Sequence, residues 1–486
     1  MFKRNKEIVI ILISFILRLF ASCLVEPGID EAYYGYLGRN PAWGFFDHPP
    51  AVSLLAGCGE QIFGIISPFT LRFGTILLFI ITSWFFYDLC KSIFGKKTAI
   101  TALILMNLIP FFSLGMGCFV FPDNVLGFGW VFFLWSINKV RISGNDKWFI
   151  ISGIAAGISF LAKYHAIFLI GSMGLLLILY PNWRKYWRSI WLYIGLATAF
   201  LIFLPNIIWN FRNDWISYAY QFGKSKGEIQ LSITHLGQFF AGQLVFLLPW
   251  NLILIFDSLL INLHKTIKKT NWLFPFIFLP YLTFLYFGLT RTVLPHWSMP
   301  SFIAALPLLA EHIEKWKAKT RHRYLWFSCI FLIVVIFIYI IQTTTGFIPL
   351  LRKIDPTLDG EGWDEVIFEL KRDCFDKDRI FLFTRRYYTG GELAYAAGGD
   401  FLCTVLYKDP HIFAYTVDPD DLVGKDAIMV TQHDRYPRNP ESLYMEYFRK
   451  IEHYKDVNTF RINGKIAQKY RLYYCTEFLK PYRNEY

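Results

Sequence analysis

The chain carries little charge and lacks the common motifs of soluble enzymes. Only 18% of its 486 residues are charged, whereas 55% are hydrophobic and 19% are aromatic. A soluble domain of this size carries more charge. The sequence has no zinc-type spacing of cysteine and histidine, no P-loop and no G-x-G-x-x-G dinucleotide motif. These absences disfavour a soluble nucleotide-dependent or zinc-dependent enzyme and favour a membrane protein.

Long apolar runs are what the sequence has instead. Eleven of them predict a polytopic helical membrane protein, at roughly 7–25, 69–90, 98–116, 124–138, 148–162, 165–180, 189–208, 236–262, 272–289, 298–311 and 323–345. The first run is longer than the core of a signal peptide, and no A-x-A-like cleavage site follows it, so we expect it to be retained.

Positive charge gives the expected orientation. If the runs cross the membrane alternately, one set of connecting segments holds twenty Lys and Arg residues and the opposite set holds seven. Positive residues stay on the cytoplasmic side, which predicts a cytoplasmic N-terminus and an external C-terminus. The net charge of +12 is therefore explained by membrane topology and does not require nucleic acid as a partner.

Two domains are expected. Residues 1–345 form a transmembrane domain with a large first outer loop over 26–68, in which Pro49-Pro50 starts an amphipathic helix. Residues 346–486 are more charged and contain short β-type runs at 379–384, 401–406 and 427–431, which predict a small external α/β domain. Two of the three cysteines in this tail could form a disulfide, but the sequence does not select the pair: Cys374, Cys403 and Cys475.

Asp30 and Glu31 are the most informative pair. They lie where the first span leaves the membrane, in Gly28-Ile-Asp-Glu-Ala-Tyr-Tyr-Gly-Tyr36. Adjacent carboxylates at this place suggest a reaction site facing away from the cytoplasm, with Tyr33 and Tyr34 in support. The alternative is structural, because Asp30 can also cap a short helix.

Further polar residues are expected at the same membrane face. Asp47 and His48 stand between two aromatic residues and two prolines, either as a rigid capped turn or as an anion contact oriented by Asp47. Asp123 precedes the fourth span, where it either caps the helix or joins the site.

Basic residues complete the candidate set. Lys163 and Tyr164 join two spans with almost no loop, so Lys163 either extends to the membrane surface or meets a phosphate. Trp297 fits an aromatic belt at the interface. The other basic or protonatable candidates are Arg72, Arg291 and His296.

Together these residues suit the transfer of a sugar from a lipid phosphate. A carboxylate takes the proton of an acceptor hydroxyl. Lys and Arg stabilise the charge that develops on the departing phosphate. The lipid tail of the donor remains in the bilayer while its headgroup reaches the outer loop.

Five motifs resemble those of the membrane glycosyltransferases of the GT-C class. They are Asp30-Glu-Ala-Tyr-Tyr34, Phe46-Asp-His-Pro-Pro50, Pro122-Asp123, Leu161-Ala-Lys-Tyr164 and Pro295-His-Trp297. The chain is most similar to the bacterial branch related to dolichyl-phosphate-mannose protein mannosyltransferases and the lipid A aminoarabinose transferase. The similarity includes the tail, over 381–395.

The resemblance implies an inverting transfer from a polyprenyl-phosphate sugar, such as an undecaprenyl-phosphate sugar, to a lipid, glycan or protein. It also implies a location in a bacterial cytoplasmic membrane with the site outside. Asp30 matches the family's base and Asp123 matches a second acid near the site. His48 stands where the aminoarabinose branch has a lysine that meets the lipid phosphate, and Lys163 is a candidate to compensate.

No cofactor is certain, and a divalent metal between Asp30, Glu31 and Asp123 remains an open alternative. A flippase or transporter for lipid-linked sugars is the competing function. Such proteins usually have repeated halves and ionisable groups near the membrane midplane, whereas the ionisable groups of this chain gather in outer loops.

Overall fold

The computed structural model describes residues 5–223, 231–264, 269–351, 355–432 and 440–482. The chain divides into two compact units. The helical unit comprises Met1–Phe20, Ala42–Val52 and Arg72–Ile333, and the sheet unit comprises Ala21–Pro41, Ser53–Leu71 and Val334–Tyr486. Parts of the first outer loop therefore cluster with the tail, whereas the sequence placed the whole loop in the transmembrane domain.

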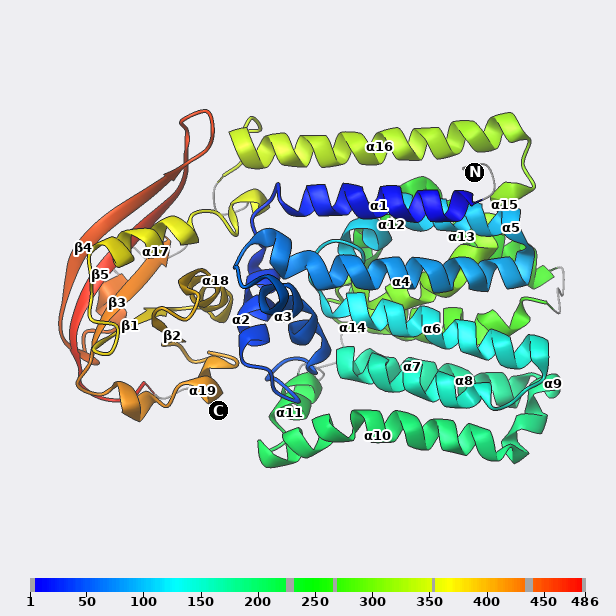
Figure 1. Ribbon diagram of the computed structural model, residues 1–486, viewed down its shortest axis with the longest axis horizontal. Helices are drawn as coiled ribbons and strands as arrows, with labels where there is room; N and C mark the ends of the chain where they lie inside the picture. Colours follow the sequence, from blue (N-terminus) through cyan, green and yellow to red (C-terminus); the bar gives the residue numbers. More distant parts are fainter. Residues whose placement is uncertain (1–4, 224–230, 265–268, 352–354, 433–439, 483–486) are drawn as a thin grey trace. The chain divides into compact units, whose positions relative to one another are not determined.

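The helical unit is a bundle in which α6 packs on α7 and α7 packs on α10 (Figure 1). Its α-helices are α1 (Lys6–Ser22), α4 (Pro68–Phe94), α5 (Lys96–Leu108), α6 (Pro122–Ser143), α7 (Trp148–Ala162), α8 (Ile167–Leu179), α9 (Pro181–Arg184), α10 (Ile190–Arg212), α11 (Ile216–Gly223), α12 (Ile233–Leu247), α13 (Pro249–His264), α14 (Phe274–Thr290), α15 (Met299–Glu314) and α16 (Ala318–Thr345), the last of which continues into the sheet unit. Short helical turns join them: η1 (Phe111–Gly115), η2 (Tyr164–Ala166), η3 (Lys185–Arg188), η4 (Asn271–Leu273) and η5 (Pro295–Ser298).

Several of these helices are long and apolar enough to cross a membrane. Among the described residues five helices qualify, or up to seven if each of two bent pairs is one span. The protein is therefore a multi-pass membrane protein by length and composition, and eleven crossings remain a prediction. Every apolar run predicted from the sequence coincides with at least one helix.

The run predicted as one span over 236–262 is divided into α12 and α13. The two helices meet at an angle of 100°. Leu248 between them has a positive φ of 70°, which is rare for a leucine. Pro249 then begins α13, where its missing N–H costs no helical hydrogen bond. The composition is apolar on both sides of the break. The sequence therefore did not predict this bend.

The sheet unit combines a mixed sheet with helices from both ends of the chain. Its elements are α2 (Ile29–Arg39), α3 (Ala51–Phe63), η7 (Pro356–Leu358), α17 (Trp363–Arg372), β1 (Ile380–Thr384), α18 (Tyr387–Ala397), β2 (Leu402–Val405), α19 (Phe413–Thr416), η8 (Pro419–Leu422), β3 (Asp426–Gln432), η9 (Pro440–Leu443), β4 (Phe448–Phe460) and β5 (Ile466–Phe478). The three predicted β-runs are confirmed as β1, β2 and β3, and α3 confirms the helix after the two prolines.

The sheet has the strand order β2-β1-β3-β5-β4 (Figure 1). Strands β1, β2 and β3 are parallel, and β5 runs antiparallel to both β3 and β4. One face of the sheet buries an aromatic core that includes Phe381, Phe383 and Phe448. The long β4–β5 hairpin was not predicted, because β4 is an edge strand with many charged residues and few apolar ones.

Helix α2 packs tightly against α18 inside the sheet unit. A Cβ atom added to Gly391 would lie 2.8 Å from the Cβ of Tyr33, so only glycine fits there. Arg39, at the C-terminus of α2, donates hydrogen bonds to the carbonyl oxygens of Ala394 and Tyr395 at 3.2 and 3.0 Å. Arg39 also pairs with Glu60 of α3 at 2.9 Å. The helix that carries Asp30 is thereby held on the tail domain.

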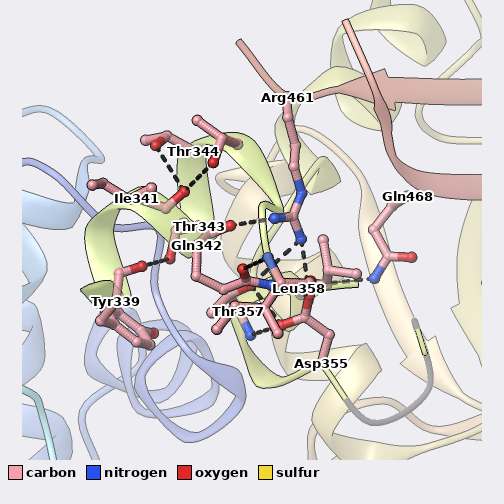
Figure 2. A network of polar contacts seen from close by, with 12 residues as sticks. Tyr339, Ile341, Gln342, Thr343, Thr344, Asp355, Thr357, Leu358, Arg461 and Gln468 are labelled. Carbon is pink, nitrogen blue, oxygen red and sulfur yellow. Dashed lines mark hydrogen bonds and ion pairs between the residues drawn. The ribbon is translucent and has the colours of Figure 1, made fainter. Parts of the chain in front are cut away.

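A buried polar network joins the end of α16 to the tail (Figure 2). Arg461 pairs with Asp355 at 3.0 Å, with only 5% and 4% of the two side chains exposed. Gln342 of α16 donates a hydrogen bond to Asp355 at 3.2 Å. Burial favours the neutral acid, but hydrogen bonds from Thr357 and the Arg461 charge outweigh it and lower the pKa of Asp355. The network anchors the last long helix to the sheet unit.

Candidate active site

Asp30 lies in the first turn of α2. Gly28 is the N-cap residue, and the Glu31 carboxylate accepts a hydrogen bond from the Gly28 N–H at 3.1 Å. Glu31 therefore makes the capping contact that the sequence had offered as the alternative for Asp30, and its side chain is only 3% exposed. Asp30 itself remains open to solvent.

The environment of Asp30 favours its protonated form. Dense surrounding protein desolvates the carboxylate, and the negative charges of Glu31 and Asp359 add to this effect. Together they raise the pKa of Asp30 above its usual value. A carboxylate that is accessible and more basic than usual is suited to take a proton.

The predicted supporting tyrosines of α2 are buried. Tyr33 is 1% exposed and Tyr34 is 4% exposed. The Tyr33 ring lies 5.7 Å from the ring of Tyr387 and 6.5 Å from that of His411. Tyr33 therefore packs α2 on the tail domain.

In the helical unit, Asp123 forms a buried ion pair with Lys163. The Lys163 ammonium lies 3.1 and 3.0 Å from the two carboxylate oxygens, and the side chains are only 6% and 8% exposed. Asn124 accepts a hydrogen bond from the Phe121 N–H at 2.6 Å and so supplies the helix-capping contact. Asp123 therefore pairs with Lys163 and does not cap the helix. Lys163 is buried in this pair and does not extend to the membrane surface.

Histidines and aromatic rings surround this pair. The His165 ring lies 5.5 Å from the ring of Trp297 and 5.0 Å from that of Phe284. Electrostatic interactions connect His165 with Lys163, His296 and His48. The candidates Lys163, His48, His296 and Trp297 thus gather in one place, although they come from three separate segments.

His296 is neutral at physiological pH in this environment. Burial lowers the pKa of His296, the Lys163 charge adds to this effect and the Asp123 charge partly opposes it, which together bring the pKa to about 4. A neutral imidazole contributes a hydrogen bond and not a positive charge. Lys163 is therefore the group with fixed positive charge in this cluster.

The loop with Asp47 and His48 is held by α10 and α11. Ser217 and Gln221 of α11 donate hydrogen bonds to the carbonyl oxygens of Phe45 and Asp47, both at 2.5 Å. The Asp47 charge also acts on Tyr164, which places this loop beside the Lys163 segment. These hydrogen bonds hold the loop on α11, and an electrostatic interaction connects His48 with His165.

Arg72 and Arg291 have other surroundings. Arg72 is fully buried, with its guanidinium 5.1 Å from the centre of the Phe119 ring. Arg291 lies over Phe287 at 4.8 Å. The part of Arg72 and Arg291 in phosphate binding remains a prediction.

Sequence reasoning missed two neighbours of these sites. His165 stands beside Lys163 in a motif that was noticed, but a histidine in an apolar stretch carries no sign of its partners. Asp359 acts on Asp30 from the tail, 329 residues further along the chain. Only folding brings such distant residues together.

No metal site is evident among the residues that the structure describes. Among the described residues no group of three His, Cys, Asp or Glu side chains is placed to hold a metal ion. Asp123 has Lys163 as its partner, and Glu31 is engaged with Gly28. In the described part of the chain no cysteine is in a disulfide, and this includes the three cysteines of the tail.

Comparisons with known proteins agree with this picture. A family model described as dolichyl-phosphate-mannose-protein mannosyltransferase matches residues 47–209. The lipid A galacturonosyltransferase RgtD of Rhizobium johnstonii is 22% identical over 186 residues, which are 38% of this chain and 39% of that protein. The matched region therefore spans about two fifths of that relative's length.

Solved structures resemble nearly the whole chain. ArnT from Cupriavidus metallidurans in the apo state has a TM-score of 0.68 at 14% identity, over 96% of this chain and 97% of that one. The same protein bound to undecaprenyl phosphate has a TM-score of 0.66 at 13% identity, over 97% and 98% of the two chains. The resemblance to the GT-C class of membrane glycosyltransferases is thus confirmed. The chain has the fold of ArnT over almost its entire length.

Proposed function

We propose that the protein is an inverting glycosyltransferase that uses an undecaprenyl-phosphate sugar as donor. The acceptor is the hydroxyl group of a lipid, glycan or protein at the outer face of a bacterial cytoplasmic membrane. The N-terminus is cytoplasmic in this proposal, and both the site and the tail domain are external. The donor class rests on the match to ArnT, one structure of which holds undecaprenyl phosphate.

The observation that carries the proposal is the state of Asp30. Its carboxylate is open to solvent, is not used to cap α2, and has a raised pKa. These are the properties of a general base, because a base works best when its pKa lies near the working pH.

In the proposed reaction Asp30 takes the proton of the acceptor hydroxyl. The acceptor oxygen forms a bond to the anomeric carbon of the sugar as the bond from that carbon to the phosphate oxygen breaks. The bonding electron pair leaves with the polyprenyl phosphate. This single displacement inverts the anomeric configuration.

Lys163 and its neighbours are proposed to meet the donor phosphate. Lys163 is a buried cation in the free protein and has His165 and the neutral His296 beside it. A phosphate entering this cluster competes with Asp123 for the ammonium and gains hydrogen bonds from imidazole. Such bonds strengthen as negative charge develops on the leaving phosphate.

Transfer by the purified full chain in lipid nanodiscs tests the proposal. A panel of undecaprenyl-phosphate pentoses and hexoses serves as donors, and mass spectrometry of the products identifies any transferred sugar. We expect Asp30→Asn to lower the turnover by about 100-fold or more and to leave binding of undecaprenyl phosphate unchanged. Asp376→Asn is the matched control, because this aspartate of the same unit is 61% exposed. Full activity of the Asp30 variant would remove Asp30 as the base.

A flippase for lipid-linked sugars is the second candidate, and one observation favours it. The helix pair α12–α13 is bent by 100° and the pair formed by α8 with the following segment is bent by 108°. Discontinuous helices of this kind form substrate sites in many transporters. Movement of a fluorescent undecaprenyl-phosphate sugar across a liposome membrane, without any transferred product, would support the flippase and contradict the transferase.

A further inference from the structure

The turn of the β4–β5 hairpin caps the C-terminus of α16. The Ile462 N–H donates a hydrogen bond to the carbonyl oxygen of Thr344 at 3.1 Å. The Asn463 side chain donates one to the carbonyl oxygen of Thr345 at 2.7 Å. Both oxygens belong to the last turn of the helix, where a carbonyl group has no partner within the helix itself. The tail domain therefore completes the end of a helix that is long and apolar enough to cross a membrane.

Arg461 holds this turn in place (Figure 2). Its guanidinium donates a hydrogen bond to the carbonyl oxygen of Gln342 and pairs with Asp355. A positive charge is favourable at the C-terminus of a helix, because the helix dipole is negative there. Gly346 makes the close approach possible, since it has a φ of 56° and a Cβ atom added to it would overlap the guanidinium. The turn is thus fixed on the end of α16 within the sheet unit.

The residues on either side of Arg461 are apolar and exposed. Arg461 is buried, whereas 60% of Phe460 and 86% of Ile462 are exposed. This arrangement is the reverse of what water favours, since a turn in water exposes its charged residue and covers its apolar ones.

The segment that follows α16 continues the same surface. Gln342, whose carbonyl oxygen bonds Arg461, also accepts a hydrogen bond from the Ile348 N–H at 2.9 Å and donates one to the Ile348 carbonyl oxygen at 3.2 Å. The segment and the hairpin turn therefore meet at the end of α16. Four apolar side chains of the segment are exposed: Phe347, Ile348, Leu350 and Leu351. We call these four residues, together with Phe460 and Ile462, the exit patch. An exposed apolar patch of this kind marks a contact with protein or with a membrane.

The end of α16 sets the depth of the exit patch. Among the described residues α16 is the most apolar of the five helices that could cross a membrane, and most of its apolar stretch faces outward. Thr344 follows the last apolar residue, Ile341, by three positions, which is about 4.5 Å along the helix axis. The headgroup region on either side of a bilayer core is about 5–7 Å thick. A turn bonded to Thr344 therefore lies at the level of the lipid headgroups.

We propose that the exit patch inserts into the lipid surface at which α16 ends. The partner is the phospholipid bilayer itself, and the apolar side chains enter the boundary between headgroups and acyl chains. Helix α2 belongs to the same compact unit, so this contact also holds Asp30 at a constant depth relative to the lipid. The inference does not depend on the proposed function, because a flippase with this fold would make the same contact.

Photo-crosslinking of the full chain in nanodiscs tests the proposal. The nanodiscs contain phosphatidylethanolamine and phosphatidylglycerol, and p-benzoylphenylalanine replaces Ile462. The matched control carries the same group at Met445, which is 68% exposed and precedes the opposite end of β4. Mass spectrometry after illumination should find phospholipid attached at position 462 and none at position 445.

The other products of this experiment contradict the proposal. A crosslink from position 462 to another segment of the chain would show that the protein itself covers the exit patch. A crosslinked dimer would identify a second copy of the chain as the partner. No lipid adduct at position 462, in a variant with a normal melting temperature, would likewise overturn the inference.

Hydrogen exchange in the same nanodiscs provides a second measurement. Phe460→Ser with Ile462→Ser removes the apolar groups, and because both side chains are exposed it removes few contacts within the protein. After correction for intrinsic rates, the amides of the turn should exchange at least about tenfold faster than in the wild type. Tenfold corresponds to about 1.4 kcal/mol, which is less than the burial of one isoleucine side chain contributes.

A conservative variant separates lipid contact from the structure of the turn. Phe460→Leu with Ile462→Leu keeps the apolar character and should exchange as the wild type does. Met445→Ser with Leu443→Ser changes two exposed apolar residues elsewhere in the unit and should leave exchange of the turn unchanged. Equal exchange rates in the wild type and the Phe460–Ile462 serine variant would overturn the inference, as would equally fast exchange in the leucine variant.

Discussion

The buried pair of Asp123 and Lys163 allows a quantitative prediction. Asp123→Asn keeps the shape of the side chain and removes its charge, which leaves the Lys163 ammonium buried without its counter-charge. Two charges about 4 Å apart attract by ~4 kcal/mol at an effective dielectric constant of about 20. Breaking a buried pair by removing one partner typically costs about 3–5 kcal/mol. We therefore expect Asp123→Asn to lower the free energy of unfolding by about 3–5 kcal/mol.

The double variant Asp123→Asn with Lys163→Met separates pairing from packing. Methionine has a similar volume and no charge, so the double variant should recover most of the stability that either single variant loses. Unfolding in detergent is measured by tryptophan fluorescence, and the coupling energy follows from the four proteins of the cycle. The double variant should also bind undecaprenyl phosphate more weakly than the wild type if Lys163 meets the donor phosphate.

A matched pair supplies the control for this experiment. Lys480 and Glu446 are also 3.0 Å apart, but 51% and 64% of their side chains are exposed. Solvent screens such a pair, so its coupling energy should be much smaller than that of the buried pair. A coupling energy for Asp123 and Lys163 no larger than that of this control would refute the assignment of a buried pair.

Three further predictions concern the sheet unit. Asp359→Asn removes a negative charge that raises the pKa of Asp30, so the acidic limb of the kcat/KM profile should move to lower pH. Gly391→Val should displace α2, because no side chain fits between α18 and α2. Since α2 carries Asp30, we expect kcat to fall by a larger factor than the affinity for the donor. Arg461→Met leaves a carboxylate buried without its cation and should lower the free energy of unfolding by about 3–5 kcal/mol.

Each of these predictions has a control and a contrary outcome. Asp364→Asn should leave the acidic limb in place, because Asp364 is not among the charges that act on Asp30; an unmoved limb in the Asp359 variant would contradict the coupling. Gly237→Ala is the control for Gly391, since no atom lies within 4 Å of a Cβ at Gly237. A Gly391 variant with normal kcat would show that the position of α2 does not limit the reaction. Arg449→Met removes a largely exposed cation of the same unit, and an equal loss of stability in both variants would refute burial as the cause.

The sequence determined those features that local composition and order encode. Apolar runs of membrane length specify helices, because a helix satisfies all backbone hydrogen bonds of a continuous segment in lipid within that segment. The short runs of β-branched and aromatic residues in the tail specify β1, β2 and β3. Asp30 was also identifiable, because its motif is contiguous and follows directly after a span.

Only the tertiary structure decided which residues become partners. Lys163 lies 40 residues from Asp123, and nothing in either segment names the other. The composition of 26–68 did not reveal that α2 packs on α18, since that contact depends on a glycine more than 350 residues away. Burial and charge environment arise from all segments that meet at one place. Because of these surroundings, Glu31 caps α2 and Asp30 stays accessible with a raised pKa. For the same reason His296 is neutral.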